Sequence, residues 1–350
     1  MTTVECMERD ISPPQPGKRR DGTEILPLCS PRALCASAVK INIRYIQPRK
    51  DLVLVLFLLA ALNGCGGALL PAKSPATPGD ARRPERIISL SPSTTEILYG
   101  VGAFGRVVAV SDYCQYPPEA ASLPHIGGWQ NINLERIAAL HPDLIIMTDA
   151  EEPLVKDRLD ALGVRTLAVR SRTIEDALSA IEQIGRATGN YSEAQALAAQ
   201  TRRQLEEVSA RTRNRARPRV LCVVDRVPGT LRDLYAATGG SFLAQLIETA
   251  GGQSVAPPAE KGYTQISKEA VVALDPDIII DMVQGGKGKL AEDPKSVWQE
   301  LPQIKAVRDG RIYSLHEMSV IHPSQFVGET ARRFAQIIHP EVFGEGPDKE

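Results

Sequence analysis

The strongest constraint on the fold is a stretch of sequence that occurs twice in the chain. The first copy runs from Trp129 to Met147 and the second runs from Tyr263 to Asp281. Each copy begins with an aromatic residue, continues with a polar helix-capping residue and a glutamate, and closes with Leu-x-Pro-Asp and a run of Ile and Leu. That order predicts a short capped helix, a break and a buried strand. Two such units far apart in one chain indicate two similar lobes, each with its own sheet.

Equivalent positions of the two copies pair Trp129 with Tyr263, Asn133 with Ser267, and Glu135 with Glu269. Asn and Ser are preferred N-cap residues, so we expect a helix to begin after each of them. A glutamate in the first turn is stabilised by the positive end of the helix dipole. The repeat therefore places one glutamate at an equivalent position on each lobe.

The length and charge of the chain fit a two-lobed protein. At 350 residues it is too long for one ordinary core, and its net charge of −1 gives no argument for nucleic-acid binding. We expect an N-terminal α/β lobe over residues 84–190, a connecting helix over 191–217 and a C-terminal α/β lobe over 218–345. The pattern from Tyr191 to Arg215 lacks Gly and Pro and predicts a helix of roughly 35 Å. Glutamates stand among its arginines, which favours a solvated face over an anion-binding surface.

The first part of the chain has the pattern of an exported lipoprotein. Residues 1–50 show no sustained periodicity, and we predict no fold for them. Basic residues then precede the apolar run Leu52–Leu62, which is too short to span a bilayer and fits a signal peptide over residues 51–65. The run ends at Leu62-Asn63-Gly64-Cys65, which resembles a bacterial lipobox. Cys65 is therefore the predicted lipidation site, and an uncleaved membrane anchor is the alternative.

The processed protein is expected to have a tether after its lipidated cysteine and two cysteines in its globular part. Residues 66–83 are rich in Pro, Ala and Gly, which predicts a flexible tether between the lipid and the lobes. Because a signal peptide begins within a few residues of its charged region, we expect translation to start near Val39. Only Cys114 and Cys222 then remain in the globular part, so no disulfide scaffold is expected.

The rest of the sequence predicts alternating strands and helices. Ser93-Thr-Thr-Glu96 has the spacing of a capping box and predicts a helix through Tyr99. The following Gly100-Val-Gly102-Ala-Phe-Gly105 matches the dinucleotide fingerprint, but a helix precedes it and a strand follows it, the reverse of what that fingerprint requires. Residues 225–238 predict a loop that carries Tyr235. The expected strands are 86–90, 107–110, 165–169, 219–224 and 311–315, and the expected helices are 152–162, 173–188, 241–250 and 324–338.

Three further stretches carry a resemblance to a known family. They read Arg86-Ile-Ile-Ser-Leu-Ser-Pro-Ser-Thr-Thr-Glu96, Ser111-Asp-Tyr-Cys-Gln-Tyr-Pro-Pro-Glu-Ala120 and Trp129-Gln-Asn-Ile-Asn-Leu-Glu-Arg-Ile137. Together they are similar to the cobalamin-binding proteins of bacterial ABC importers, within the iron-chelate/cobalamin class of periplasmic substrate-binding proteins. The resemblance implies two Rossmann-like α/β lobes joined by one long rigid helix, the class III periplasmic binding protein fold. It also implies a monomer that captures a corrinoid between its lobes and delivers it to an ABC permease with its ATPase.

The resemblance assigns roles to the two glutamates of the repeat. In the family, one glutamate on each lobe docks on arginines of the permease, and the matching positions are Glu135 and Glu269. The alternative is that each glutamate only stabilises its own helix. Their equivalent placement on two otherwise divergent lobes favours docking.

The resemblance also implies which side chains contact the ligand. The aromatic positions of the family correspond to Tyr113 and Trp129. A corrin is a large flat ring with an amide rim, and aromatic side chains offer it flat, largely apolar faces. Tyr116 and Tyr263 are further candidate contacts, although Tyr116 precedes Pro-Pro and has a structural turn role as its equal alternative. Candidate hydrogen-bond donors to the ligand are Gln130 and Ser91.

The sequence departs from the cobalamin pattern in one loop of the second lobe. Where the family has an Asp-Trp-aromatic stretch, this chain reads His316-Glu-Met-Ser-Val-Ile-His-Pro323. That change removes an aromatic from one wall of the expected cleft and adds two histidines. It leaves another corrinoid or a haem open in place of vitamin-type cobalamin, and ferric siderophores are a further alternative. His322 is a candidate contact to a ligand's metal, but a single histidine before proline is more often an ordinary loop residue.

An enzyme is the competing class of function, and the motifs do not support it. The five histidines are dispersed, and the sequence has no H-E-x-x-H, G-x-S-x-G or Walker motif. We therefore expect no catalytic residues, no metal site and no cofactor. The expected protein is an exported, lipid-anchored receptor for a small molecule.

Overall fold

The computed structural model describes residues 83–128, 130–260, 262–282, 294–315 and 318–344. All of them lie in one compact unit, Ala76–Glu350. The predictions for the signal peptide, Cys65 and most of the tether fall outside the described residues, as does Trp129. Within the described part, no helix is long and apolar enough to cross a membrane.

The first lobe is built on a four-stranded parallel sheet with the order β2-β1-β3-β4. Because the sheet is covered on both faces, its strands are runs of apolar residues rather than alternating ones. Helices α2 and α5 share one core cluster with the sheet, and α3 and α4 share another on the opposite face. The elements are β1 Ile87–Ser89, α2 Pro92–Gly100, η1 Phe104–Arg106, β2 Val107–Val110, η2 Pro118–Ser122, α3 Leu134–Ala139, β3 Leu144–Thr148, α4 Glu152–Ala161, β4 Thr166–Val169 and α5 Ile174–Thr188.

The second lobe has a mixed sheet with the order β10-β9-β5-β6-β8, and β7 pairs with β5. Strands β5, β7, β9 and β10 are parallel, whereas β6 runs antiparallel to β5 and β8. The elements are β5 Arg219–Asp225, β6 Leu234–Ala237, α7 Phe242–Thr249, β7 Gln253–Ser254, β8 Tyr263–Ile266, α8 Lys268–Leu274, β9 Ile278–Asp281, α9 Pro294–Trp298, α10 Lys305–Arg308, β10 Ile312–Tyr313, η4 Met318–Ile321, α11 Val327–Ile338 and α12 Pro340–Phe343.

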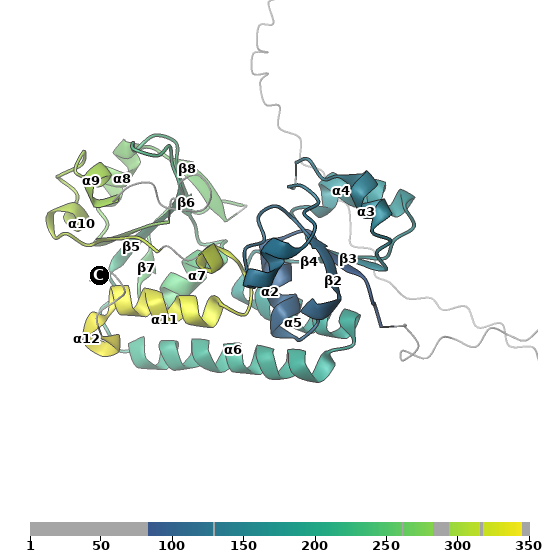
Figure 1. The fold of residues 1–350 in the computed structure, drawn as a ribbon. Coiled ribbons are helices and arrows are strands. Elements are labelled where there is room, and N and C mark those ends of the chain that lie inside the picture. Colours follow the sequence, from purple (N-terminus) through teal and green to yellow (C-terminus); the bar gives the residue numbers. More distant parts are fainter. Residues whose placement is uncertain (1–82, 129, 261, 283–293, 316–317, 345–350) are drawn as a thin grey trace, which may run out of the picture. The chain divides into compact units, whose positions relative to one another are not determined.

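One long helix, α6 Tyr191–Thr212, belongs to both lobes. Its residues Ala194 and Ala198 lie in a core cluster of the first lobe, and Leu205 and Val208 lie in a core cluster of the second. With 22 residues it spans about 33 Å. Figure 1 shows α6 running along one side of both lobes, with α11 beside it. A helix begins at Tyr191, as predicted, but it ends at Thr212 rather than at residue 217.

The repeat produces the same local structure in both lobes, as predicted. The side chains of Asn133 and Ser267 cap α3 and α8 by accepting a backbone N–H from the first turn. A residue with left-handed backbone follows each helix, His141 with φ 44° after α3 and Asp275 with φ 38° after α8. His and Asp are among the non-glycine residues that adopt this conformation most readily. His141 is therefore a turn residue, and its equivalence to Asp275 is structural.

The aspartate of each Pro-Asp pair accepts hydrogen bonds from the backbone where the neighbouring strand begins. Asp143 accepts backbone N–H groups from Glu85 and Arg86, just before β1, and Asp277 accepts the N–H of Arg219 at the start of β5. The two arginine side chains donate in return to the carbonyls that end the helices, Leu140 and Leu274. These reciprocal bonds explain why Pro-Asp follows the helix in both copies.

Two predictions about local structure were wrong. Residues 225–238 are not all loop, because β6 covers Leu234–Ala237; its short Leu-Tyr-Ala-Ala sequence has weak strand propensity and forms a strand through pairing with β5 and β8. Ser93 and Glu96 do not form a capping box. Helix α2 instead begins at Pro92, after Ser91, and has no side-chain cap. The Glu96 carboxylate instead makes hydrogen bonds to residues of the second lobe.

The glycine-rich string after α2 behaves as predicted. Helix α2 ends at Gly100, the chain turns through Gly102 with φ 72°, and β2 begins at Val107. A helix before the glycines and a strand after them exclude a dinucleotide-binding turn there. Cys114 and Cys222 are both free and buried.

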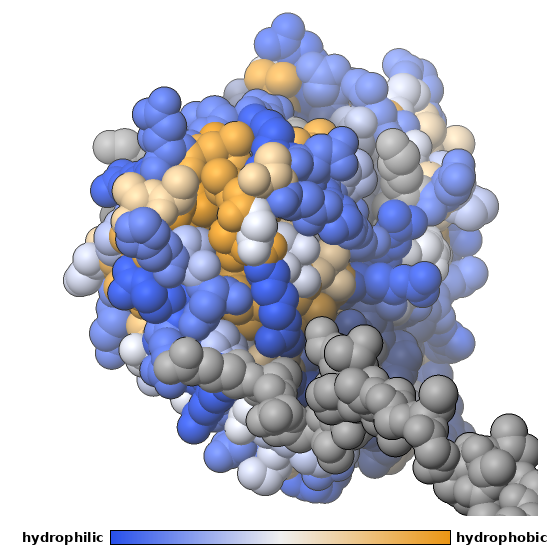
Figure 2. All heavy atoms as spheres, turned by 90° about the vertical axis from the view of Figure 1, so that its right-hand side faces the viewer, coloured by the Kyte–Doolittle hydropathy of each residue, from blue (hydrophilic) through white to orange (hydrophobic). Residues whose placement is uncertain are grey.

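The outer side of the first lobe is mostly polar. Figure 2 views the protein from the right-hand side of Figure 1, where this lobe lies, and shows one gathering of hydrophobic side chains surrounded by hydrophilic ones. Two leucines of this lobe, Leu154 and Leu162, are among its exposed large hydrophobic residues.

Candidate functional site

The topology of the first lobe places a candidate site at the carboxyl ends of β1 and β3. These two strands are neighbours, but the chain leaves β1 for α2 on one face of the sheet and leaves β3 for α4 on the other. In open α/β sheets a crevice forms where neighbouring strands diverge in this way, and ligands bind there. Ser91 follows β1, and Thr148 and Glu151 follow β3.

Hydroxyl groups surround the start of α2. Ser89 Oγ lies 2.6 Å from Thr94 Oγ1 and accepts from Thr95 Oγ1 at 2.8 Å. The hydroxyl of Ser91 lies 3.1 Å from Ser93 Oγ, and Ser91 is buried. The carboxyl end of β1 therefore presents uncharged polar groups. That Ser91 donates to a ligand stays a prediction.

Glu151 lies at this candidate site, and the sequence patterns gave it no role. Its Oε2 accepts the Thr148 backbone N–H at 2.8 Å and the Thr148 hydroxyl at 3.2 Å. Burial raises the pKa of its carboxyl, and the hydrogen bonds from Thr148 act against that shift. An available signal was its position, directly after a strand of the repeat, where α/β folds place ligand-binding groups.

The loop after β2 holds the first predicted aromatic contact. Tyr113 is 52% exposed, which makes it the most exposed large hydrophobic residue of the described part. Gly128 lies against it so closely that a Cβ there would come within 2.9 Å of the Tyr113 ring. The Asn131 side chain holds this glycine by accepting its N–H at 2.9 Å. Gln130 is exposed in the same turn. The ligand contacts of Tyr113, Trp129 and Gln130 stay predictions.

Tyr116 lies in an aromatic cluster that joins the lobes. Its ring centroid is 5.3 Å from that of Tyr99 and 5.0 Å from that of Phe326, with the rings edge to face. Burial raises the pKa of the Tyr116 hydroxyl. This packing gives Tyr116 a structural role between α2 and the segment before α11. A ligand contact stays a prediction.

Next to this cluster, the second lobe holds a buried carboxylate of the first. Glu96 is 2% exposed, and its Oε1 lies 2.6 Å from His322 Nδ1 while Oε2 accepts from Ser324 Oγ at 2.5 Å. Gln325 Nε2 donates to the Glu96 carbonyl at 2.9 Å. His322 therefore has a partner inside the protein. Because a carboxylate accepts from Nδ1–H, this contact favours the tautomer in which Nε2 carries the lone pair.

In the second lobe, Tyr263 opens β8 and packs half-buried against a core cluster. Burial raises the pKa of its hydroxyl. At the carboxyl ends of β5 and β9 lies a buried ion pair, in which Arg226 Nε donates to Asp281 Oδ2 at 3.0 Å. Trp298 Nε1 donates to the same oxygen at 2.7 Å. Removing one partner of a fully buried charge pair is strongly destabilising, because the other charge then loses its compensation.

The two glutamates of the repeat are exposed at the first turns of α3 and α8. The pKa of Glu269 is lowered, first by its own backbone N–H and then by the Ser267 hydroxyl, so its carboxylate is charged at neutral pH. Glu135 occupies the matching position after Asn133. Both glutamates stand where a partner protein could reach them.

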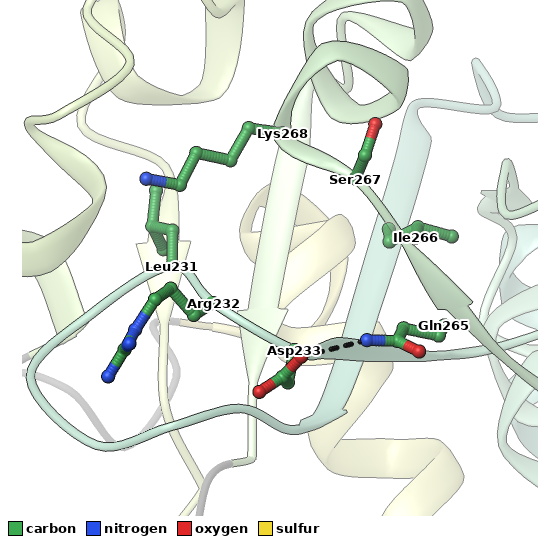
Figure 3. Close-up of a pocket in the computed structure, with 7 residues that line it drawn as sticks. All are labelled: Leu231, Arg232, Asp233, Gln265, Ile266, Ser267 and Lys268. Atoms are coloured by element: carbon green, nitrogen blue, oxygen red, sulfur yellow. Dashed lines mark hydrogen bonds between the residues drawn. The ribbon is translucent and has the colours of Figure 1, made fainter. Parts of the chain in front are cut away.

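A surface hollow of about 600 Å³ lies beside Glu269. Figure 3 shows that the end of β8 and the segment before β6 line it together, with Asp233 and Gln265 joined by a hydrogen bond of 2.9 Å. Lys268 lines it too and pairs with Glu300 outside the hollow. The hollow is open and its lining is mixed in charge, so it does not resemble a site for a flat apolar ligand.

Among the described residues, no group of three or more His, Cys, Asp or Glu side chains is placed to hold a metal ion. Two further described histidines lie next to carboxylates. His125 pairs with Asp112 at 3.7 Å, and His339 lies 3.0 Å from Glu341.

Residues 87–318 match the model of the periplasmic binding protein family. The chain belongs to this family. A curated relative, the vitamin B12-binding protein of Yersinia pestis (strain Pestoides F), is 30% identical over 227 residues, which are 64% of this chain and 77% of the relative. As a family member, the protein is a substrate-binding protein of an ABC transporter, not an enzyme, and the family implies export to the periplasm.

Solved structures with the same fold include binding proteins for different ligands. The periplasmic vitamin B12-binding protein of Vibrio cholerae has a TM-score of 0.62 and 25% identity, covering 73% of this chain and 96% of that one. A periplasmic heme-binding protein of Pseudomonas aeruginosa has a TM-score of 0.63 and 25% identity, covering 74% and 94%. The predicted two-lobed fold, the class III periplasmic binding protein fold, is confirmed.

Proposed function

We propose that this protein captures a corrinoid in a cleft between its lobes and delivers it to the permease of an ABC importer. The observation that carries the proposal is the 30% identity to a curated vitamin B12-binding protein over 227 residues. The match to the Vibrio cholerae vitamin B12-binding protein covers 73% of the chain and supports the same ligand class.

The chemistry of the first lobe is compatible with a corrinoid. Tyr113 presents an exposed aromatic ring beside the carboxyl end of β2, and a flat corrin would bury much of it. The hydroxyl cluster around Ser91 offers uncharged hydrogen-bonding groups near the divergence of β1 and β3. Amides at the rim of a corrin both donate and accept hydrogen bonds, which suits such groups.

Delivery to the permease would use Glu135 and Glu269. Both carboxylates are exposed, and each stands in the first turn of a helix. Matching charges on two lobes would fix the orientation of docking, because a complementary pair of cationic groups must meet both at once.

Attachment to the membrane would use a lipid on Cys65. The support is the apolar run Leu52–Leu62 and the lipobox-like Leu62-Asn63-Gly64-Cys65. A lipid anchor would keep the receptor near its permease and raise the local concentration of bound ligand there.

Haem is the second candidate ligand, and one observation favours it. The Pseudomonas aeruginosa heme-binding protein matches in fold at the same 25% identity as the vitamin B12-binding structure. The contact of His322 Nδ1 with Glu96 also leaves Nε2 as the nitrogen able to bind a metal, an arrangement common among metal-ligating histidines.

Calorimetric titration of the purified full-length protein tests the proposal. Cyanocobalamin and cobinamide represent corrinoids, and haemin represents the alternative. We expect one-to-one corrinoid binding that Tyr113→Ala weakens by about tenfold or more. Tyr191→Ala is the matched control, since Tyr191 is similarly exposed at 47% but lies at the start of α6. Binding of haemin alone would refute the corrinoid proposal.

A further inference from the structure

Glu151 stands at the position in the first lobe that topology marks for a ligand. It lies three residues after the end of β3. There the chain passes to the face of the sheet opposite to the one that it reaches after β1. Sequence patterns and family resemblance gave it no role. Its carboxyl group is nevertheless the one acidic group of the described chain that is both buried and placed directly after β3.

We propose that Glu151 is a specificity-determining residue that favours ligands with uncharged carboxamide rims and disfavours ligands with carboxylate rims. This inference rests on the proposed receptor function and narrows its ligand class to amide-rimmed tetrapyrroles. The corresponding ligands are corrinoids, and the disfavoured class contains haem.

The first support is the way the carboxyl group is held. Thr148 fixes Oε2 through its backbone N–H and its hydroxyl, whereas no described residue hydrogen-bonds to Oε1. One oxygen therefore anchors the group and the other is left for a partner outside the described chain. A carboxylate oxygen in this situation accepts hydrogen bonds from N–H donors strongly.

The second support is the absence of a compensating cation among the described residues. Glu151 forms no ion pair there, and burial is the main cause that raises the pKa of its carboxyl. A buried carboxylate without a cation repels a second carboxylate strongly, because the interior screens charge poorly. Haem carries two propionates, whereas the rim of a corrin carries amides, so the same group would attract one ligand and repel the other.

A purely local role makes a different prediction. Glu151 occupies the N-cap position of α4 but makes no side-chain cap bond, and its hydrogen bonds run back to Thr148. If the residue only closed this turn, glutamine would serve equally well, since its amide oxygen can accept the same two bonds. Glu151→Gln therefore keeps the turn and removes the charge.

The test compares three forms of the full-length protein, namely wild type, Glu151→Gln and the control Glu152→Gln. Glu152 is the neighbouring carboxylate, in the first turn of α4, whereas Thr148 donates to Glu151. Dissociation constants for cobinamide and for haemin are measured for each form. Circular dichroism verifies that the variants are folded.

We expect wild type to prefer cobinamide. In Glu151→Gln, the ratio of the haemin to the cobinamide dissociation constant should fall by about tenfold or more, since a charge-assisted hydrogen bond is lost and a repulsion is removed. In Glu152→Gln the ratio should not change. An unchanged ratio in Glu151→Gln, or an equal fall in Glu152→Gln, would overturn this inference and leave the corrinoid proposal standing.

The titrations of wild type distinguish failure of the inference about Glu151 from failure of the proposed function. Preference of wild type for haemin over cobinamide would overturn both the role of Glu151 and the corrinoid proposal. Absence of binding to either ligand would remove the proposed function itself, and the inference about Glu151 with it.

Discussion

The buried ion pair of the second lobe allows a quantitative prediction about stability. Arg226 and Asp281 have side chains that are 0% exposed, and Asp281 Oδ2 also accepts the indole N–H of Trp298. Asp281→Leu would remove the carboxylate that bonds to the buried Arg226 guanidinium, and breaking a buried ion pair from one side costs about 3–5 kcal/mol. The indole N–H would lose its acceptor as well, at about 1 kcal/mol or more. The expected loss is therefore about 4–6 kcal/mol.

That loss should appear as a large fall in the melting temperature. For a folded unit of this size, 1 kcal/mol shifts the melting temperature by about 2–4 °C. Thermal unfolding followed by circular dichroism should therefore show Asp281→Leu melting about 10–20 °C below wild type. Tyr235→Ala, at an exposed position of β6 in the same lobe, is the control and should shift it far less.

A double-mutant cycle identifies the cause. If the cost comes from breaking the ion pair from one side, Arg226→Met combined with Asp281→Leu should be less destabilising than Asp281→Leu alone, because both charges of the pair are removed. Additive losses in the double variant, or a melting temperature within a few degrees of wild type for Asp281→Leu, would refute the reasoning.

Three further predictions concern docking on the permease, attachment to the membrane and the pH dependence of folding. Replacing Glu135 and Glu269 together with alanine should leave ligand affinity unchanged and abolish uptake in cells, measured with radiolabelled cobalamin; weaker binding by the purified variant would argue against docking. Cys65→Ala should leave binding intact and release the protein from the membrane fraction, and a variant that stays with the membrane would contradict lipidation. Burial raises the pKa of Glu151, so folding favours its protonated form, and its contribution to stability falls as pH rises through the raised pKa. Glu151→Gln should therefore gain stability relative to wild type as pH rises from acidic to neutral in urea unfolding, and parallel pH profiles would show that the carboxyl is not perturbed.

The sequence predicts well those parts of the fold that local chemistry determines. Asn133 and Ser267 cap their helices in both copies of the repeat, because a capping bond needs only residues within the next turn. The long helix α6 and the turn at Gly102 are equally local. Each of these features follows from a few consecutive residues, so reading along the chain is enough.

The sequence fails where a distant partner decides the outcome. Ser93 and Glu96 have the spacing of a capping box, but the Glu96 carboxylate bonds to His322 and Ser324 from the other lobe. Strand β6 exists because β5 and β8 flank it. The proposed role of Glu151 likewise depends on a distant feature, because it follows from the order of β1 and β3 in the sheet. Strand order cannot be predicted from propensity.

The repeated and the unrepeated parts of the two lobes differ in which proposed function they would serve, docking on the permease or choice of ligand. The repeated units, α3 with β3 and α8 with β9, fold alike and carry Glu135 and Glu269 at matching positions. The connections that differ between the lobes include those that follow β1, β2 and β5, at the carboxyl ends where α/β folds bind ligands. We infer that docking depends on the repeat and ligand choice on the divergent loops. Substitutions at Glu151 should therefore change specificity without changing recognition by the permease.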